Sequence, residues 1–378
     1  AAGTGAGACF FGGRAGTDIT AFRLLPAPKT RYKEYAGKFA NRSDQQRGGL
    51  HLTEAEIRSI LPEPERSNFD DIVLQRVLGA SRHIAMIGAM LCAIASDYAV
   101  KNGDTKAMLR DLTALADYLK ATRGQASSAI GNAIDLMTRD FGTLDSLPAS
   151  EAAKAVTRAV SSYDKQARQS IETLTDYAVS LAAGMRRILV FDYSSTVVRF
   201  LEKFGAACPG AVVVIPESRV INGGYAFVPG ALAAGLRVHF IPDAAILYEL
   251  KTCDAAYFGA ETFYPDGTAF NTTGSDIVGL ACRECGVPLY VLTPLMKLDM
   301  RPLRGFVRRL VNNNTREKMK TAGFTEQELE QVDFDCPELL PVGADMIRAF
   351  ITEQGVIPAQ SMFERSVKYA EFLAGGND

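Results

Sequence analysis

The sequence is poor in the residue types that most often bind metals or form disulfide frameworks. Its 378 residues include three histidines and seven cysteines, and the cysteines are scattered along the chain. A structural zinc site needs four ligands at suitable spacing, whereas the single C-x-x-C pair, Cys282 and Cys285, has no second pair to join it. We therefore expect no metal site. We interpret the pair as packing residues of a helix, with a zinc or redox pair as the rarer alternative, and the thiols as reduced.

Charge of one sign is not in excess either. Lysine and arginine number 41 and aspartate and glutamate 43, so the net charge of −2 attracts neither nucleic acid nor a membrane surface. The longest apolar run, Ile84–Ala95, is shorter than the roughly 20 residues of a membrane span. The first residues carry no basic segment ahead of an apolar stretch, so we expect no secretory signal. These features predict a cytoplasmic protein that binds no nucleic acid and no membrane.

A dinucleotide-binding loop is missing as well. The glycine-rich segments near the start, "GTGAGA" and "GGRAG", do not form a G-x-G-x-x-G element between a strand and a helix. We therefore expect no cofactor. We predict that residues 1–69 form an irregular arm, which packs on the body of the protein or on a neighbouring chain.

The rest of the chain consists of two segments with different periodicity. Residues 70–185 place apolar side chains at three- and four-residue spacing, which predicts a helical domain. In residues 186–378, short β-rich runs alternate with helical segments of about ten residues, which predicts a parallel sheet. The candidate strands are residues 187–191, 211–215, 237–241, 255–259 and 288–292. The predicted fold class is α/β, with an N-terminal helical domain followed by a Rossmann-like, doubly wound parallel sheet domain.

Polar, glycine-bearing or charged loops follow all five candidate strands. Ligands bind outside the carboxyl ends of the strands in open sheets of this kind. Three hydroxyls at the start of a helix can donate to an anion or form an ordinary helix cap, and they belong to Ser194, Ser195 and Thr196. Arg219 follows the next strand and can clamp a phosphate or carboxylate, or pair with Glu217.

Two carboxylates, Asp243 and Glu261, also follow strands of the predicted sheet. We expect one sheet edge to bring them near one another, where they could exchange protons, hold ribose hydroxyls or cap helices. The remaining candidates for an anion seat are Asn271, Gly274 and Ser275, which precede a helix, together with Lys297 and Arg123. Together these residues predict that the ligand is a small, polar, phosphorylated molecule.

Several motifs between about residues 70 and 370 occur in order and without large gaps. They include "VLGASRHIAMIGAMLCAIA", "ATRGQASSAIGNAI", "ILVFDYSSTVVRFL", "VVVIPESRVINGG" and "FDCPELLPVGADMIRAFITEQGVI". These motifs resemble the isomerases of methylthioribose-1-phosphate and ribose-1,5-bisphosphate. That family shares its fold with the alpha, beta and delta subunits of the exchange factor for eukaryotic translation initiation factor two. The resemblance implies a pocket for a C1-phosphorylated sugar between the two domains, and homodimers or higher homo-oligomers.

The resemblance also implies which positions carry the chemistry. The isomerases move protons with a cysteine in the first strand loop and an aspartate in a Gly-Ala-Asp loop, and these positions fall here on Tyr193 and Glu261. Two cations of the family are replaced by Leu78 and Thr272. The positions that match the family, and that we expect to bind substrate, are Gly79, Ala80, Arg123, Glu217, Ser218, Arg219, Asp243, Asn271, Gly274 and Lys297.

Two hypotheses follow from these residues. The first is a divergent enzyme of the aldose–ketose isomerase type, with Glu261 as the main acid or base and Asp243 on sugar hydroxyls. Tyr193 or Asp192 would then replace the thiol, although a tyrosine, with a reference pKa of about 10, needs a strongly cationic setting for that role. The phosphate would be held by Arg123, Arg219, Ser194, Ser195 and Thr196. The second hypothesis is a non-catalytic regulatory protein that binds a sugar phosphate or a nucleotide, like the exchange-factor subunits.

Overall fold

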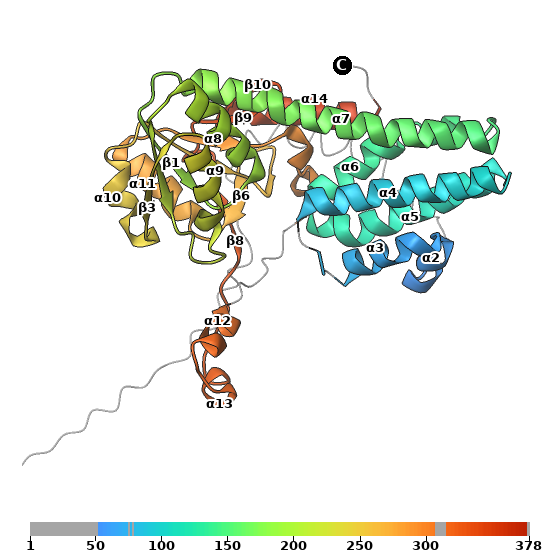
Figure 1. The fold of residues 1–378 in the computed structure, drawn as a ribbon, viewed down its shortest axis with the longest axis horizontal. Coiled ribbons are helices and arrows are strands. Elements are labelled where there is room, and N and C mark those ends of the chain that lie inside the picture. The colour runs from blue at the N-terminus through green and yellow to red at the C-terminus, as the bar shows by residue number, and fades with distance from the viewer. Residues whose placement is uncertain (1–51, 75, 78, 307–314, 376–378) are drawn as a thin grey trace, which may run out of the picture.

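A computed structural model of the chain describes residues 52–74, 76–77, 79–306 and 315–375. Figure 1 shows a helical part and a part built around a sheet, with the long helix α7 (Ala149–Leu181) running along both. Most of the arm predicted over residues 1–69 lies outside the described residues.

Five further helices form the helical part with α7. They are α2 (Glu54–Ile60), α3 (Glu63–Val73), α4 (Ala80–Val100), α5 (Thr105–Ala126) and α6 (Ser128–Thr138). The described end of the predicted arm is therefore helical from residue 54, not irregular. Thr53 and Glu56 form a reciprocal cap at the start of α2, and Ile57 and Phe69 are buried in the helical core.

Within the described part of the chain, α4 is the one helix long and apolar enough to cross a membrane, with a mean hydropathy of 1.5. It extends the apolar run Ile84–Ala95 at both ends. Ile87, Leu91 and Ile94 on this helix are buried against the other helices of the helical core. Because its apolar face packs inside the protein, α4 is a core helix of the helical part.

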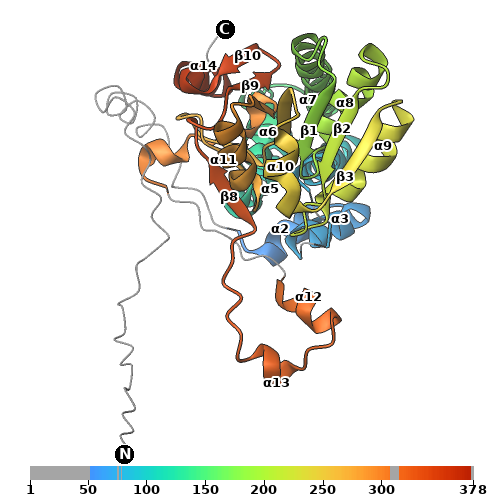
Figure 2. The same cartoon turned by 90° about the vertical axis from the view of Figure 1, so that its left-hand side faces the viewer.

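The main sheet has seven strands in the order β10-β9-β7-β4-β1-β2-β3, and every neighbouring pair is parallel except β9 and β10. The strands are β1 (Arg187–Phe191), β2 (Val212–Pro216), β3 (Arg237–Ile241), β4 (Ala255–Gly259), β7 (Leu289–Leu292), β9 (Ala349–Thr352) and β10 (Gly355–Pro358). This arrangement confirms the predicted α/β fold class, and Figure 2 shows the parallel strands with helices on both faces.

The helices cover the two faces of the sheet in separate groups. One face packs against α7, α8 (Ser195–Ala207) and α9 (Val228–Ala233). The other packs against α10 (Ile246–Leu250), α11 (Ser275–Cys285) and α14 (Met362–Leu373). Such double winding places a switch point between β1 and β4, where the chain direction across the sheet reverses.

A second, antiparallel sheet with the order β5-β6-β8 was not expected from the sequence. Its strands are β5 (Thr262–Phe263), β6 (Ala269–Thr272) and β8 (Leu339–Val342), and the short helices α12 (Thr315–Thr321) and α13 (Glu326–Leu329) precede β8. The hairpin of β5 and β6 follows β4 directly, so it stands beside the switch point.

Helix α7 belongs to both cores. Val156 and Val160 near its start pack in the helical core, whereas Leu174 and Ala178 near its end pack against the sheet. The boundary predicted at residues 185 and 186 follows this shared helix, and the division into domains stays a prediction.

Candidate functional site

The loops at the switch point begin with Asp192, after β1, and with Ala260 and Glu261, after β4. Strands β1 and β4 are direct neighbours in the sheet, with Phe191 opposite Phe258. Their carboxyl ends therefore open side by side, at the position where doubly wound sheets bind ligands.

Asp192 is buried and tightly held at this point. Its φ of +58° is uncommon for a residue with a side chain, and its carboxylate accepts hydrogen bonds from Thr272 Oγ1 at 2.7 Å and Ser218 Oγ at 3.2 Å. Burial raises the pKa of Asp192 above its usual value, although the hydrogen bonds from Thr272, from the Tyr193 backbone and from Ser218 oppose the shift. A Cβ atom at Gly223 would lie 2.4 Å from Asp192 Oδ1, so this close packing requires glycine.

Glu261 stands at the mouth of the β5–β6 hairpin. Its backbone N–H donates to Phe270 O at 2.9 Å, while its half-buried carboxylate has no hydrogen-bond partner in the described chain. The side chain of Lys297 approaches from the turn after β7, and its Nζ donates to Ala260 O at 2.7 Å. Burial lowers the pKa of Lys297, and the nearby charge of Glu261 opposes that shift. An unpaired carboxylate next to a lysine is an arrangement suited to proton transfer.

The helical part is fixed to this edge by α6. Ser128 Oγ, at the start of α6, shares a hydrogen bond with Thr262 Oγ1 at 2.8 Å and donates to Lys297 O at 3.0 Å. Further along the helix, Asn132 Nδ2 donates to Met296 O and Leu298 O at 2.8 and 2.9 Å. The N-terminus of α6 therefore lies next to Glu261, since Thr262 is the following residue.

Buried polar atoms without a hydrogen-bond partner concentrate around this position. Six such side-chain atoms occur in the described residues, and four of them belong to Arg123, Ser127, Asn271 and Ser275. On the helical side, Arg123 lies five residues before Ser128, near the end of α5, and Ser127 lies directly before it. On the sheet side, Asn271 and Ser275 flank Thr272, which holds Asp192. A buried donor that finds no partner in the protein is a donor available to a ligand.

The carboxylate of Asp243 holds the loop after β2 and forms a clamp on two of its backbone N–H groups. Its Oδ1 and Oδ2 accept the backbone N–H groups of Ser218 and Arg219, both at 2.8 Å. Strands β3 and β4 are separated by β2 and β1, so three strand spacings, about 14 Å, lie between the ends that carry Asp243 and Glu261. The structure therefore does not place the two carboxylates next to each other, because Asp243 shapes the loop after β2.

The structure brings only some of the residues that were expected to bind phosphate into the buried part of the site. Ser194 precedes α8 but makes no side-chain capping hydrogen bond, so its hydroxyl is not used as an ordinary cap. Ser195 is exposed at the first position of α8, and Thr196 is buried. Arg219 is exposed and makes no ion pair with Glu217 among the described residues; its Nη1 lies 3.4 Å from Asn222 Oδ1.

Tyr193 does not point into the buried part of the site. Its side chain is 49% exposed, and its ring packs at 6.0 Å from that of Phe227.

Gly274, with φ +107°, begins α11 against the ring of Phe191, where a Cβ atom would lie 2.9 Å from that ring. Gly79 and Ala80 begin α4, and no hydrogen bond in the described residues joins them to the strand-end loops. Leu78 lies outside the described residues.

Sequence reasoning missed the roles of Thr272 and Ser127, whereas Ser275 was already a candidate for the anion seat. Thr272 was noted only as the position of a lost lysine, yet it anchors Asp192. Nothing in the spacing of the serines distinguishes a buried, unpaired hydroxyl from a surface hydroxyl. The available signal was the position of Ser127 and Ser275 at the start of predicted helices, where backbone N–H groups are free.

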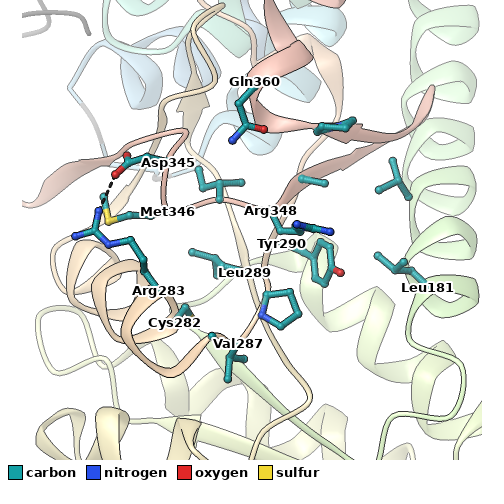
Figure 3. A pocket seen from close by; sticks show the side chains of 16 residues that line it. Leu181, Cys282, Arg283, Val287, Leu289, Tyr290, Asp345, Met346, Arg348 and Gln360 are labelled. Atoms are coloured by element: carbon teal, nitrogen blue, oxygen red, sulfur yellow. Dashed lines mark hydrogen bonds and ion pairs between the residues drawn. The ribbon is translucent and has the colours of Figure 1, made fainter.

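Two large cavities lie away from the switch point. The first, about 960 Å³, opens at the amino ends of β7 and β9; Figure 3 shows Arg283 and Asp345 paired on one side of it and Arg348 near Tyr290. Cys282 lines it and is buried, which raises the pKa of its thiol to about 12 and suits a packing residue. The second cavity, about 910 Å³, lies between α7 and α14.

Replacing Asp243 by asparagine is expected to destabilise the protein by about 2 kcal/mol, because an amide cannot accept both backbone N–H groups and turns an N–H donor against one of them. The midpoint of urea unfolding measures this loss. Asp145→Asn is the matched control, since Asp145 is exposed and makes no hydrogen bond in the described chain. Equal midpoints for the two variants would show that the clamp contributes nothing.

Residues 78–359 match the model of the Initiation factor 2 subunit family. A ribose 1,5-bisphosphate isomerase of Archaeoglobus fulgidus is 30% identical over 152 residues, which are 40% of this chain and 47% of that protein. The match to the corresponding protein of Methanocaldococcus jannaschii, at 27% identity over 161 residues, covers 43% of this chain and 51% of that protein. The chain thus spans about half the length of these curated relatives.

Longer but weaker matches cover nearly the whole chain. A methylthioribose-1-phosphate isomerase of Naegleria gruberi is 22% identical over 351 residues, or 85% of this chain and 90% of that protein. The crystal structure of 5-methylthioribose 1-phosphate isomerase from Pyrococcus horikoshii OT3 has a TM-score of 0.64 at 17% identity, over 82% of this chain and 92% of that one. A chain of the tetrameric eIF2B-beta2-delta2 complex from C. thermophilum has a TM-score of 0.57 at 15% identity. This match covers 91% of the present chain and 100% of that one. At these identities the solved structures show a shared fold.

Proposed function

The chain belongs to the Initiation factor 2 subunit family, and from this premise we propose that it binds a phosphorylated sugar at the switch point and isomerises it. The family includes sugar-phosphate isomerases and regulatory subunits, so membership alone leaves both roles open. The choice between them depends on the chemistry of the strand ends.

The observation that carries the proposal is the set of unpaired polar groups around the switch point. The donors of Arg123, Ser127, Asn271 and Ser275 find no acceptor among the described residues, and the Glu261 carboxylate accepts no hydrogen bond from them. A sugar phosphate supplies what both kinds of group lack, since its phosphate oxygens accept hydrogen bonds and its hydroxyls donate them. A passive phosphate site needs donors, but it has no use for an unpaired carboxylate.

The carboxyl groups of Glu261 and Asp192 have different surroundings, which suit one to the role of a base and the other to the role of an acid. Isomerisation of a sugar 1-phosphate moves the hydrogen of C2 to C1 and breaks the bond between C1 and the ring oxygen. The proton of the C2 hydroxyl leaves as the ketone forms, and the ring oxygen takes up a proton, so the reaction needs a base and an acid. Glu261 is the base, because its carboxylate is unpaired and Lys297 stands beside it. Asp192 takes the second role in place of Tyr193, since burial raises the pKa of Asp192 and favours its protonated form.

The test is incubation with a panel of pentose and hexose 1-phosphates in deuterated water, followed by proton NMR. We expect deuterium to replace hydrogen at C2, and a ketose phosphate to accumulate, for at least one member of the panel. If no member exchanges its C2 proton and none yields a ketose, the chain is not an isomerase of these sugars.

The second candidate is non-catalytic binding of a sugar phosphate or nucleotide, as in a regulatory subunit. The observation in its favour is Tyr193, which replaces the thiol that the resemblance implies and is turned to solvent beside Phe227. Thermal stabilisation by a sugar phosphate in the absence of C2 exchange would favour this role over catalysis.

A homodimer or higher homo-oligomer is also part of the proposal. Large apolar side chains are exposed around the β3 edge of the sheet, among them Tyr225, Leu232, Phe240 and Tyr248. The rings of Tyr225 and Phe240 lie together, 5.1 Å apart, and exposed apolar side chains that gather in this way are typical of protein–protein contacts. The cytoplasmic location stays a prediction from the composition.

A further inference from the structure

The cavity of about 910 Å³ between α7 and α14 is separate from the switch point and has a distinct chemical character. Helices α6, α7 and α14, the β9–β10 turn and the 3-10 turn η4 (Leu295–Lys297) all contribute to its lining. We propose that this cavity is a second binding site, whose ligand is a small anion with an aromatic body and an N–H donor at the end opposite its charge.

The floor of the cavity fits an aromatic body. Tyr163 and Tyr369 line it and are 6% and 8% exposed, so each ring is held by the surrounding protein and shows the cavity only a small part of its surface. Tyr163 Oη donates to Met296 Sδ at 3.5 Å, so its phenol group needs no partner from a ligand. Phe372, half-buried on α14, adds apolar surface, and the guanidinium of Arg139 lies 4.4 Å from the centroid of its ring. Aromatic and thioether groups favour contact with a planar ring over contact with a flexible polar chain.

An acceptor stands at the inner end of the cavity. Glu353, in the turn between β9 and β10, accepts the Leu295 backbone N–H with Oε1 at 3.2 Å and Oε2 at 3.1 Å. A carboxylate has about four acceptor positions, and the backbone N–H groups of Leu295 and of Glu353 itself leave some of them open. Burial raises the pKa of Glu353, and the backbone N–H groups of Glu353 and Leu295 oppose the shift. A donor on the ligand relieves this desolvation, so the position selects for an N–H.

Cations stand at the rim. Arg365 and Lys368 are exposed on one face of α14 and form no ion pair or hydrogen bond in the described part of the chain. Glu371 also lines the rim, so these three residues carry a net charge of +1 there (two positive, one negative). Two unpaired cations at the entrance favour a ligand whose negative charge stays there. The rest of the lining is partly polar, with Gln166, Gln169, Ser170, Thr173 and Gln354.

The turn η4 connects this cavity to the switch point. Leu295 bonds to Glu353 and Met296 lines the cavity, while Lys297 donates from the same turn to Ala260 O beside Glu261. A ligand that contacts Met296 and Glu353 therefore contacts the segment that positions Lys297. This coupling, which rests on the proposed function, makes the cavity an effector site for binding at the switch point.

The test of binding is a fluorescence titration with 6-amino-2-naphthyl phosphate, using 2-naphthyl phosphate as the analogue without the donor. We expect the amino compound to bind at least tenfold more tightly. Glu353→Gln should abolish that preference, and Arg365→Gln combined with Lys368→Gln should weaken both compounds about tenfold. Arg348→Gln is the matched control, since Arg348 is an exposed arginine at the other cavity, and it should leave both affinities unchanged.

The double glutamine variant changes only exposed side chains, so it keeps the test valid if Glu353→Gln fails to fold. Equal affinity of the two probes for the unmodified protein would overturn the proposal. So would binding that survives the double variant and is displaced by ribose 1-phosphate, because the probe would then occupy the switch point.

The coupling is measured separately, as the change in probe affinity at saturating ribose 1-phosphate. We expect a change of at least threefold in either direction, and an unchanged affinity would refute the coupling alone. If ribose 1-phosphate does not bind at all, the proposed function fails while the probe titration still decides whether the second site exists.

Discussion

Replacing Glu261 by glutamine is expected to lower the turnover of the sugar phosphate about 10³-fold and to leave its KM nearly unchanged. The glutamine amide has almost the shape of the carboxylate and can still bind a hydroxyl, but it cannot take a proton from carbon. Glu261 makes no hydrogen bond through its side chain in the described chain, so the substitution breaks no existing contact. Initial rates and single-turnover C2 exchange, followed by NMR, measure the two effects.

The matched control for this substitution is Glu284→Gln. Glu284 is exposed near the end of α11 and makes no ion pair among the described residues, so its neutralisation should leave turnover and KM as they are. Glu261→Gln with turnover within threefold of the unmodified protein would remove Glu261 from the chemistry. Unchanged thermal stability of both variants would show that the loss is not a folding defect.

The sheet was predictable because each strand is a short apolar run bounded by turn residues. Residues 187–191, 237–241 and 255–259 are the bounds that the structure gives to β1, β3 and β4. In a parallel sheet both faces are covered, so the strands read as nearly continuous apolar segments. Because these strands are parallel, the loops that follow them all lie at one edge of the sheet, whatever the order of the strands.

The elements that were missed lack this pattern. Strands β9 and β10 and the small sheet are only two to four residues long, and they depend on pairing with segments distant in sequence, such as Asn271 with Leu340. Helix α2 begins at the cap formed by Thr53 and Glu56, a signal that was present in the sequence and not used. Short elements of this kind are decided by tertiary contacts and not by local periodicity.

The sequence predicted which edge of the sheet carries these side chains, but it predicted only part of what each side chain does there. The edge was inferred from polar loops, and Lys297, Asn271 and Glu261 stand at the switch point as expected. Asp243 does not face Glu261, because the number of strands between them depends on the strand order, which residue types alone do not give. The burial that raises the pKa of Asp192 likewise depends on the packing of Ser218, Thr272 and Gly223 around it.

Replacing Asp192 by asparagine is expected to raise the stability of the folded protein at neutral pH and to lower turnover roughly 10²-fold. Asparagine tolerates a φ of +58° better than most residues, so the backbone of the loop can stay as it is. Its amide can bond to the hydroxyls of Ser218 and Thr272, but it carries no proton for an acid to deliver.

The pH dependence of this effect has a definite sign. Burial raises the pKa of Asp192 in the folded state, so the charged carboxylate destabilises the folded protein at pH values above that pKa. As the pH falls through the folded-state pKa, the carboxyl group takes up a proton and the destabilisation disappears. The asparagine variant has no such titration, so its advantage over the unmodified protein should shrink as the pH falls.

Urea unfolding of both proteins between pH 7 and pH 4 measures this difference. An advantage that grows as the pH falls would mean that the hydrogen bonds of Thr272 and Ser218 stabilise the ionised carboxylate by more than burial disfavours it. Asp192 would then be a fixed anion that positions the loop after β1, and the acid of the reaction would have to be another group at the switch point. The direction of the pH dependence therefore decides which of these two roles Asp192 has, independently of any assay for turnover.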